Sequence, residues 1–338
     1  RKNKLNFNKF FGKNKIFVVA EIGNNHEGNY KNAIKLIDKA SEAKVDAVKF
    51  QSFLTEGYLS SSIDKKRTKL LKKFQLSFNE FKKLSIYAKK KGLIFFSTPL
   101  DLKSCDYLNK IQPIFKIASG DNNYEALIKK IIKFKKPTII STGMMDYNDV
   151  LKLYRFVKKL RINSKLGILH CVSNYPALPE ELNLNSIMFL KKKFPNCYVG
   201  YSDHSIGIEA CMVAASMGAK IIEKHFTLSH NFSKFRDHKL SANPSEMSLL
   251  VKKIREIEIM RGKFYKIITK NEKKNKVNIR RSIAANKTLE IGHRIKESDL
   301  IMLRPGTGYE YKDRKFIIEK KVVKVIKKSE ILKRNCIR

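Results

Sequence analysis

Short apolar segments alternate along this chain with longer amphipathic ones. Eight segments are rich in β-branched and aromatic residues and end in polar residues, which predicts strands. They span 16–23, 46–51, 93–99, 114–120, 138–143, 166–173, 197–203 and 220–226. Apolar residues at helical spacing predict helices at 31–43, 78–91, 123–135, 147–160, 180–193, 207–217 and 244–261.

Strict alternation of strands and helices predicts a parallel α/β sheet, and eight such units predict closure into a (β/α)8 TIM barrel. An open, doubly wound sheet is the alternative, but no GxGxxG motif follows the first strand. The second unit contains a longer loop, 52–77, with a Lys-rich insertion. We therefore expect a catalytic barrel over residues 1–262.

The pattern changes after residue 262. Residues 263–279 are polar and basic, which indicates a linker, and 280–338 contain short strands and turns. This second segment is near the lower size limit for independent stability, so we expect it to rest on the barrel or on a second chain.

The chain is strongly basic, with 71 Lys and Arg against 31 Asp and Glu, a net charge of +40. Such a charge suggests nucleic acid as a partner. The lysines, however, are spread through helix-like stretches such as "YAKKKG" and "FLKKKFP", which is typical of a solvated surface. We expect no nucleic-acid partner, although the charge favours anionic substrates.

Five cysteines without a CxxC spacing predict neither a disulfide framework nor a zinc site, and favour a reducing compartment. The basic N-terminal stretch lacks the apolar core of a signal peptide, and no apolar run approaches eighteen residues. We therefore expect a cytoplasmic protein without a membrane partner.

Polar residues gather where the predicted strands end, which is where the active site of such a barrel lies. A purely structural barrel needs few of them, because a buried charge is costly unless it is paired. Two lysines with several hydroxyl groups suit a phosphate and a carboxylate. The candidates are Glu21, Lys49, Gln51, Thr98, Lys116, Ser119, Ser141, Ser173, Asn174, Tyr175 and Ser202.

The stretch "IEKHFT" at 222–227 adds a candidate metal site. The two-residue period of a strand places Glu223 and His225 on one face and Lys224 on the other. The same rule pairs Ser202 with His204. If both faces point inward, the two imidazoles meet across adjacent strand ends and suit a divalent transition metal with open positions. We expect Glu223 to support this site, or to pair with a charged neighbour of Lys224, rather than to bind the metal.

Two residues keep alternative roles. Glu21 lies at the predicted barrel mouth, where it contacts substrate, moves a proton, caps a helix or pairs with a barrel lysine. Lys49 is an anion contact or, alternatively, the Schiff-base lysine of an aldolase, which requires a desolvated lysine with a lowered pKa.

Eleven motifs occur in order over 15–310: "AEIGNNHEG", "AVKFQ", "FSTP", "FKIASGD", "STGM", "LHCVSNYP", "GYSDHSIG", "IEKHFT", "DHKLSANP", "RRSIAANKTLEIGHRI" and "LRPGTG". The chain thereby resembles the sialic acid synthase family, which comprises N-acetylneuraminate synthase and its legionaminate and pseudaminate relatives. Residues 280–338 resemble the family's antifreeze-like (SAF) domain, which is swapped onto the partner of a homodimer.

The resemblance implies condensation of phosphoenolpyruvate with an amino-sugar aldehyde, either N-acetylmannosamine or a 2,4-diacetamido-6-deoxy hexose, to a nine-carbon 2-keto acid and phosphate. "DHKLS" is closer to the neuraminate and legionaminate branches than to the pseudaminate branch. The resemblance also implies a divalent metal, manganese or alternatively magnesium. The segment 226–236 lacks the glycine and proline expected before Asp237.

The resemblance assigns roles residue by residue. The catalytic residues would be Glu21, Lys49, His204 and His225, and the two histidines would bind the metal. Phosphoenolpyruvate contacts would be Lys49, Thr98, Lys116, Ser119, Ser141, Ser173 or Asn174, and Ser202. Sugar contacts would be Glu21, Gln51, Tyr175, Asp237 and either Arg280 or Arg281 of the other chain.

Three other functions remain open on the sequence alone. A different phosphoenolpyruvate–aldehyde synthase, of the deoxy-octulosonate-phosphate type, would use phosphorylated sugars and would not need the C-terminal segment. A Schiff-base aldolase would not need metal. A nucleic-acid-binding barrel would show salt-dependent binding and tolerate loss of His204.

Overall fold

The computed structural model describes residues 15–160 and 166–338. The chain forms two compact units that divide between Gly262 and Lys263, which is where the sequence pattern changes. Within the described residues, no helix is both long and apolar enough to span a bilayer.

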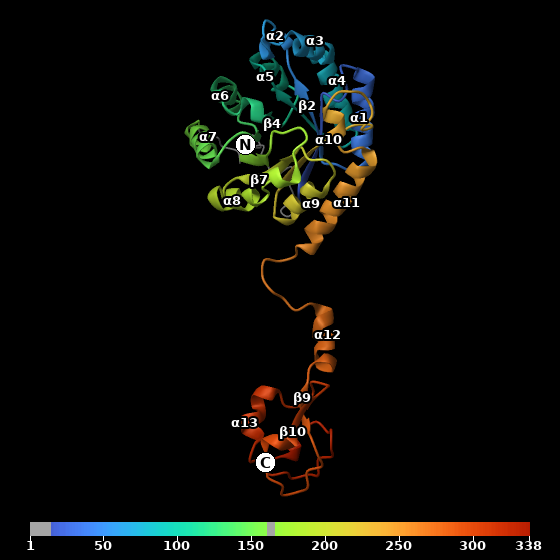
Figure 1. Cartoon of the computed structure of the whole chain (residues 1–338), viewed down its shortest axis with the longest axis vertical. Coiled ribbons are helices and arrows are strands. Elements are labelled where there is room, and N and C mark those ends of the chain that lie inside the picture. The colour runs from blue at the N-terminus through green and yellow to red at the C-terminus, as the bar shows by residue number, and fades with distance from the viewer. Residues whose placement is uncertain (1–14, 161–165) are drawn as a thin grey trace, which may run out of the picture. The chain divides into compact units, whose positions relative to one another are not determined.

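The first unit contains eight parallel strands in the order β3-β2-β1-β8-β7-β6-β5-β4. Strands β3 and β4, at the two ends of this order, contact each other, so the sheet is a nearly closed barrel and the predicted fold is confirmed (Figure 1). The strands are β1 (Phe17–Gly23), β2 (Ala47–Ser52), β3 (Ile94–Pro99), β4 (Phe115–Ile117), β5 (Thr138–Ser141), β6 (Leu166–Cys171), β7 (Tyr198–Asp203) and β8 (Ile221–His225).

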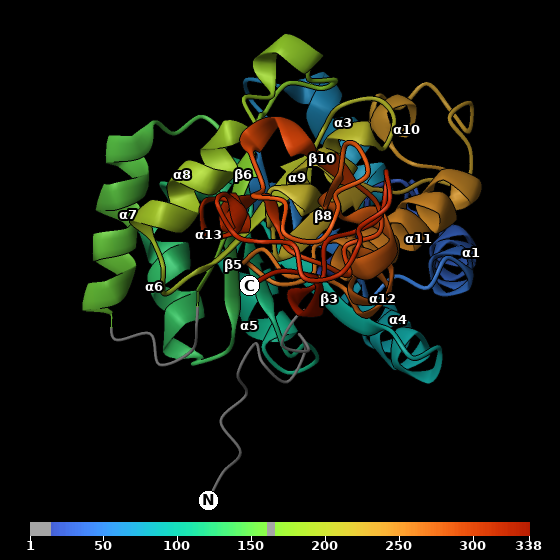
Figure 2. The same ribbon diagram turned by 90° about the horizontal axis from the view of Figure 1, so that it is seen from below.

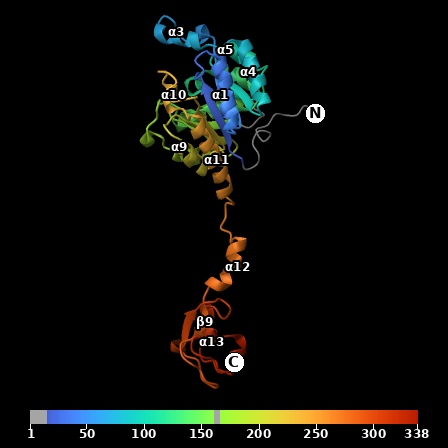
Figure 3. The same ribbon diagram turned by 90° about the vertical axis from the view of Figure 1, so that its right-hand side faces the viewer.

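Helices cover the outside of the barrel. Helix α1 contacts both α4 and α11, as Figure 3 shows, and α6 lies beside α7 on another side of the barrel (Figure 2). The helices are α1 (Tyr30–Glu42), α4 (Phe78–Lys90), α5 (Leu102–Leu108), α6 (Glu125–Lys133), α7 (Tyr147–Lys159), α8 (Asn185–Lys193), α9 (Glu209–Ser216) and α11 (Pro244–Met260).

Local sequence signals fix several helix starts. Ser77 and Glu80 form a reciprocal capping box at α4, and Asn243 and Glu246 do the same at α11. Pro244 occupies the first turn of α11, where its missing N–H has no partner to lose.

The two-residue period of the strands separates two cores. Outward-facing side chains such as Val18 and Ile222 pack against the helices. Inward-facing Phe17, Val19 and Ile221 belong to a smaller core that fills the lumen. The same inward rows continue into polar residues towards the strand ends, so the lumen is apolar at one end and ionisable at the other.

A buried ion pair lies outside the lumen, between the barrel and its helices. Lys224 Nζ lies 2.7 Å from Asp203 Oδ2 and donates to the carbonyl of Ser205 at 2.6 Å, and both charged side chains are fully buried. Tyr201 donates to the other oxygen of Asp203 at 2.9 Å. This pair ties β8 to the end of β7, next to the residues that enter the barrel mouth.

Four expectations about the local structure of the barrel unit were wrong. The loop 52–77 contains two helices, α2 (Thr55–Tyr58) and α3 (Lys65–Phe74), because Asp64 caps α3 and Leu71 and Phe74 are buried. Helix α5 follows β3 although no helix was expected there; Asp101 caps it. The strand expected to reach residue 120 ends at Ile117, and the helix expected from residue 180 begins at Asn185.

The second unit has its own small core around Ile283, Leu289 and Ile326. Strands β9 (Ser282–Ala285) and β10 (Leu300–Leu303) are antiparallel, and helix α13 (Arg314–Ile317) follows them. This small antiparallel sheet is consistent with an SAF-type domain. The segment expected as a plain linker contains helix α12 (Lys270–Ile279), which is capped by Thr269 and exposed throughout.

Asp299 stabilises this unit in a pH-dependent way. His293 Nε2 lies 2.7 Å from Asp299 Oδ2, Lys287 Nζ lies 2.9 Å from Oδ1, and the Lys296 amide donates to Oδ2 at 2.9 Å. Burial opposes ionisation, but these donors together outweigh it and lower the pKa of Asp299 below its ordinary value of 3.8.

We expect Asp299→Asn to lower the free energy of unfolding of the C-terminal unit by about 1.5–3 kcal/mol at pH 7. The lowered pKa of folded Asp299 gives stability that is fully present above the ordinary pKa. This stability is lost as the pH falls towards the pKa of the folded state. The difference in unfolding free energy between the two chains therefore shrinks below pH of about 4. Amide hydrogen exchange within residues 282–337 measures this. An equal loss at pH 3 and pH 7 would contradict the role of the charge.

Candidate active site

Two lysines and two glutamates form a buried cluster at the polar end of the lumen. Lys49 Nζ lies 2.7 Å from Glu21 Oε2 and 3.6 Å from Glu223 Oε1. Lys116 Nζ lies 3.4 Å from the same Glu223 oxygen. All four side chains are almost completely buried. Three neighbouring strands, β2, β1 and β8, and β4 across the lumen, each contribute one of these side chains.

The buried charges of this cluster shift one another's pKa values. Burial alone would raise the pKa of Glu223, but Lys116 and Lys49, with a hydrogen bond from Ser202, lower it to about 2. Burial would likewise lower the pKa of Lys49, but Glu21 and Glu223 outweigh it and raise the pKa. Burial lowers the pKa of Lys116, which Glu223 only partly offsets. The raised pKa of Lys49 speaks against a Schiff-base nucleophile at this position.

Glu21 differs from Glu223 although both are buried. Burial raises the pKa of Glu21, and the charge of Lys49 offsets this only in part. In the strand register, Glu21 lies beside Lys49 on one side and His225 on the other. A carboxyl group with a raised pKa at this position can take up or release a proton.

Hydroxyl groups surround the cluster. Lys49 Nζ donates to Thr98 Oγ1 at 3.3 Å, and Ser202 Oγ donates to Glu223 Oε1 at 2.9 Å. The oxygens of Ser141 and Ser173 are buried, and neither finds a hydrogen-bond partner within residues 15–160 and 166–338. Orphaned buried hydroxyl groups at one barrel mouth point to a ligand that would satisfy them.

Gly143 marks the centre of a small cradle. Its amide donates to Ser119 Oγ at 3.0 Å. A methyl group added at Gly143 would lie 2.2 Å from Ser173 Oγ and 2.7 Å from Ser119 Oγ. An added methyl group would therefore force these hydroxyl groups to move, because they converge above the Gly143 backbone. Such a cradle of hydroxyl groups suits an oxyanion, phosphate above all.

His204 and His225 face each other as expected, with ring centroids 5.3 Å apart. His204 Nδ1 donates to the carbonyl of Val172 at 2.6 Å, which leaves Nε2 for a ligand. Burial lowers the pKa of His225 well below its ordinary value, which keeps this ring neutral. Nδ1 of His225 is buried and has no hydrogen-bond partner in the described part of the chain.

This pair fits a divalent metal. One ring has its tautomer fixed by a carbonyl, and the other carries an orphaned buried nitrogen, which are properties of metal-binding histidines. The described residues contain no group of three or more His, Cys, Asp or Glu side chains suited to one ion. The protein would therefore supply two ligands and leave the remaining positions to water or substrate.

The predicted sugar contacts lie in two places: Tyr175 lies against His204, whereas Gln51 lies against Glu21 of the lysine–glutamate cluster. The Tyr175 ring packs against His204 with the two ring planes tilted by 30° and the centroids 4.1 Å apart, and the Arg236 guanidinium lies 4.8 Å from the centre of the Tyr175 ring. Gln51 accepts from Asn24 at 2.8 Å and donates to Glu21 at 3.4 Å. Asp237 is almost buried, and burial raises its pKa against the charges of Arg236 and His204.

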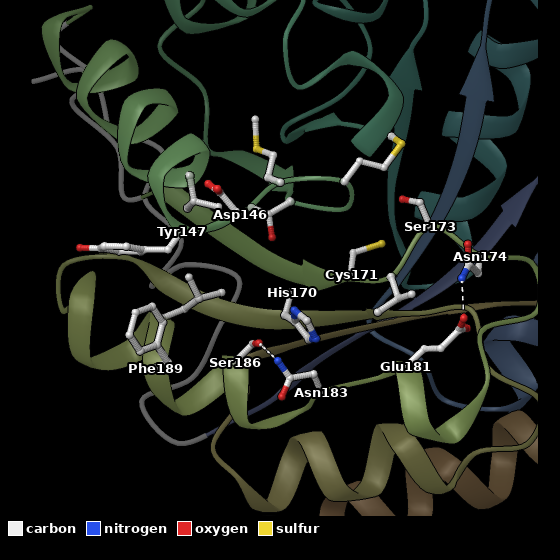
Figure 4. A pocket seen from close by; sticks show the side chains of 16 residues that line it. Asp146, Tyr147, His170, Cys171, Ser173, Asn174, Glu181, Asn183, Ser186 and Phe189 are labelled. Carbon is white, nitrogen blue, oxygen red and sulfur yellow. Dashed lines mark hydrogen bonds between the residues drawn. The ribbon is translucent and has the colours of Figure 1, made fainter.

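The structure gives the side chains of Ser173 and Asn174 different surroundings, which could not be predicted from the sequence. Ser173 faces the Gly143 cradle, whereas the exposed Asn174 donates to Glu181 at 3.0 Å. Figure 4 shows this hydrogen bond at the edge of a pocket of about 630 Å³, which extends from Ser173 towards Tyr147 and Phe189. This pocket lies beside the lysine–glutamate cluster rather than around it.

Sequence reasoning missed Asp121. It ends the short turn Ser119–Asp121 after β4. Burial raises its pKa to about 6, although the charge of Lys116 acts in the other direction. The signal was available, because the motif "FKIASGD" contains Lys116 and Ser119 and ends on this residue.

Arg280 and Arg281 belong to the second unit. Both are exposed, and Arg281 donates to the carbonyl of Met302 at 3.0 Å. Their contact with a sugar bound to another chain stays a prediction.

The chain is similar in sequence to a known protein family and to several of its members. Residues 36–266 match the model of the NeuB family. An uncharacterized protein of Methanocaldococcus jannaschii is 42% identical over 309 residues, which are 90% of each chain. The N,N'-diacetyllegionaminic acid synthase of Campylobacter jejuni is 35% identical over 333 residues, 94% of this chain and 99% of the relative.

A solved structure is also similar. The N-acetylneuraminic acid (sialic acid) synthetase of Leptospira borgpetersenii, crystallised with citrate, superimposes with a TM-score of 0.73 at 33% sequence identity. The match covers 78% of this chain and 92% of that one.

Proposed function

This chain belongs to the NeuB family, and from that premise we propose that it condenses phosphoenolpyruvate with an N-acetylated amino-sugar aldehyde to a nine-carbon 2-keto sugar acid. The names of the synthases that it resembles support this reaction. The single observation that carries the proposal is the buried Lys49–Lys116 pair beside His204 and His225, with unsatisfied hydroxyl groups next to it.

Phosphoenolpyruvate would lie between the two lysines and the serine cradle. Lys116, Ser119, Ser141 and Ser173 would hold the phosphate, while Lys49 and Thr98 would hold the carboxylate. Glu223 stays ionised at neutral pH, so it favours the charged form of both lysines and orients them before the substrate arrives. Donors that are already in place cost little reorganisation during the reaction.

The reaction forms one C–C bond and one C–O bond to water, and breaks the C–O bond to phosphate. C3 of the enol attacks the aldehyde carbon of the sugar, water adds to C2, and phosphate leaves from C2. Glu21 would move the proton of the attacking water or of the new hydroxyl group, since burial raises its pKa. Lys116 and the serines would stabilise the departing phosphate.

We propose that His204 and His225 hold a divalent metal, manganese or magnesium. A bound metal would supply Lewis-acid polarisation of the aldehyde oxygen. Tyr175, which packs against His204, would position the acceptor next to this pair, and Gln51 and Asp237 would bind its hydroxyl groups.

Phosphate release from phosphoenolpyruvate tests the proposed function. We expect release with manganese and either N-acetylmannosamine or a 2,4-diacetamido-6-deoxy hexose, and no release with EDTA. The productive sugar identifies the branch. Release only with phosphorylated pentoses or tetroses would overturn the amino-sugar assignment, and activity in EDTA would overturn the metal.

The cradle at Gly143 gives a specific prediction. We expect Gly143→Ala to raise the KM for phosphoenolpyruvate about 10–100-fold, because the new methyl group would occupy the space that Ser119 and Ser173 leave for the phosphate. Initial rates at saturating amino sugar measure this change. Gly120→Ala is the matched control, because a methyl group there meets no atom within 4 Å. An equal effect of both variants would contradict a phosphate site at Gly143.

A further inference from the structure

Two loops at the barrel mouth are joined by buried hydrogen bonds. The loop after β1 contributes Asn25, whose amide donates to the carbonyl of Phe226 at 2.8 Å and to Ser241 Oγ at 2.9 Å. The same loop contributes Glu27, whose Oε1 accepts from Ser233 and lies 3.1 Å from His238 Nε2. Phe226, Ser233, His238 and Ser241 all belong to the segment between β8 and α11.

His238 is the centre of this connection. Its side chain is fully buried, with Nδ1 at 2.7 Å from Thr227 Oγ1 and Nε2 at 3.1 Å from Glu27. Nε2–H donates to the carboxylate, and Nδ1 shares a hydrogen bond with Thr227 Oγ1, whose hydroxyl also reaches the carbonyl of Ser229 at 3.0 Å. The ring therefore links the start of its own segment to the loop after β1.

The backbone at Glu27 indicates that its side chain is needed there. Glu27 has a φ of 51°, a left-handed conformation that costs a non-glycine residue about 1–2 kcal/mol. The next residue, Gly28, has a φ of 75°, and a methyl group there would lie 2.1 Å from the carbonyl oxygen of Lys73 in α3. The loop after β1 thus packs closely against α3, which restricts the position of the Glu27 carboxylate.

Asp237 directly precedes His238 in the single-turn helix α10 (Asp237–Leu240). One of its carboxylate oxygens is buried and lacks a hydrogen-bond partner among the described residues, although the Arg236 Nε lies 3.4 Å away. Adjacent residues in a helical turn point in directions fixed relative to each other. Anchoring the His238 ring therefore also fixes where the Asp237 carboxylate points.

The sequence of this segment makes such an anchor necessary. Residues 226–236 contain neither glycine nor proline, the residues that most strongly fix turn conformations. Side-chain hydrogen bonds to the neighbouring loop can determine its course instead. Asn25, Glu27 and His238 supply these bonds.

We propose that Glu27 and His238 are positioning residues, a latch that holds Asp237 at the site of the polyhydroxy sugar acceptor. This inference rests on the proposed function, because it assumes an acceptor that Asp237 binds. The latch contacts neither the lysine cluster nor the serine cradle, so it predicts an effect on one substrate and not on the other.

Kinetics of four variants test the latch. We expect His238→Ala and Glu27→Ala to raise the KM for the amino sugar about tenfold or more, with the KM for phosphoenolpyruvate within about twofold of the unaltered chain. Glu27→Gln keeps the accepting oxygen and should restore the sugar KM to within about threefold. His230→Ala is the matched control, because this imidazole lies in the same segment but contacts Glu246 of α11 at 2.9 Å.

Hydrogen exchange supplies a readout that needs no turnover. In the full-length chain without substrate, amides of residues 226–242 should exchange faster in the two latch-breaking variants, but not in His230→Ala or Glu27→Gln. Unchanged exchange would overturn the latch. Faster exchange with an unchanged sugar KM, or an equal rise in both KM values, would overturn its role in positioning Asp237. If the unaltered chain turned over no amino sugar, the proposed function would fail, while exchange would still decide whether the latch exists.

Discussion

Replacing His225 with alanine should lower kcat/KM for the condensation about 10²–10³-fold, which corresponds to about 3–4 kcal/mol of transition-state stabilisation. His225 is buried, neutral and opposed to His204 at 5.3 Å between ring centroids. Its removal would leave a divalent ion with a single protein ligand. Steady-state rates over a range of manganese concentrations measure the loss.

Manganese binding separates this role from a structural one. Calorimetric titration of the unaltered chain without substrates should show one bound ion per chain, and His225→Ala should abolish this binding while the thermal unfolding temperature changes little. His230→Ala removes a half-exposed imidazole elsewhere and serves as the control. Normal manganese binding by the His225 variant would exclude His225 as a ligand.

Replacing Lys224 with methionine should lower the free energy of unfolding of the barrel by about 3–5 kcal/mol. Lys224 and Asp203 are both fully buried, so losing the ammonium group leaves the carboxylate without its counter-charge. Urea unfolding followed by circular dichroism measures the change. The charge pair itself contributes less than this value, since most of the loss is the cost of an unpaired buried charge.

A double replacement distinguishes these two causes. Lys224→Met combined with Asp203→Asn removes both charges, and the amide oxygen of asparagine can still accept from Tyr201 and Ser205. We expect the double variant to regain a large part of the stability lost in Lys224→Met. An additive loss would show that the ion pair is not the source of the effect.

The repeating pattern of the chain determined most of the barrel. Each of the eight predicted strands lies within a few residues of its observed position, because parallel strands buried on both faces form continuous apolar runs. Helix α5 was missed because it has only seven residues, too few for a clear periodic pattern. Helix α3 was missed because it carries lysines on most of its surface and buries only Leu71 and Phe74.

The sequence by itself determined which residues face the barrel lumen. The two-residue period assigned Glu223 and His225 to one face and Lys224 to the other, and the structure has this arrangement. Local spacing is sufficient for this assignment, because the pleat of a strand fixes the direction of each side chain.

Only the tertiary structure decided which inward side chains meet. The sequence did not identify the partners of Glu223, whereas closure of the barrel places it between Lys49 on β2 and Lys116 on β4. Closure likewise brings His238 to Glu27, which lie 211 positions apart along the chain. Such contacts depend on the stagger of the strands and the course of the loops, which are set by the packing of the whole barrel.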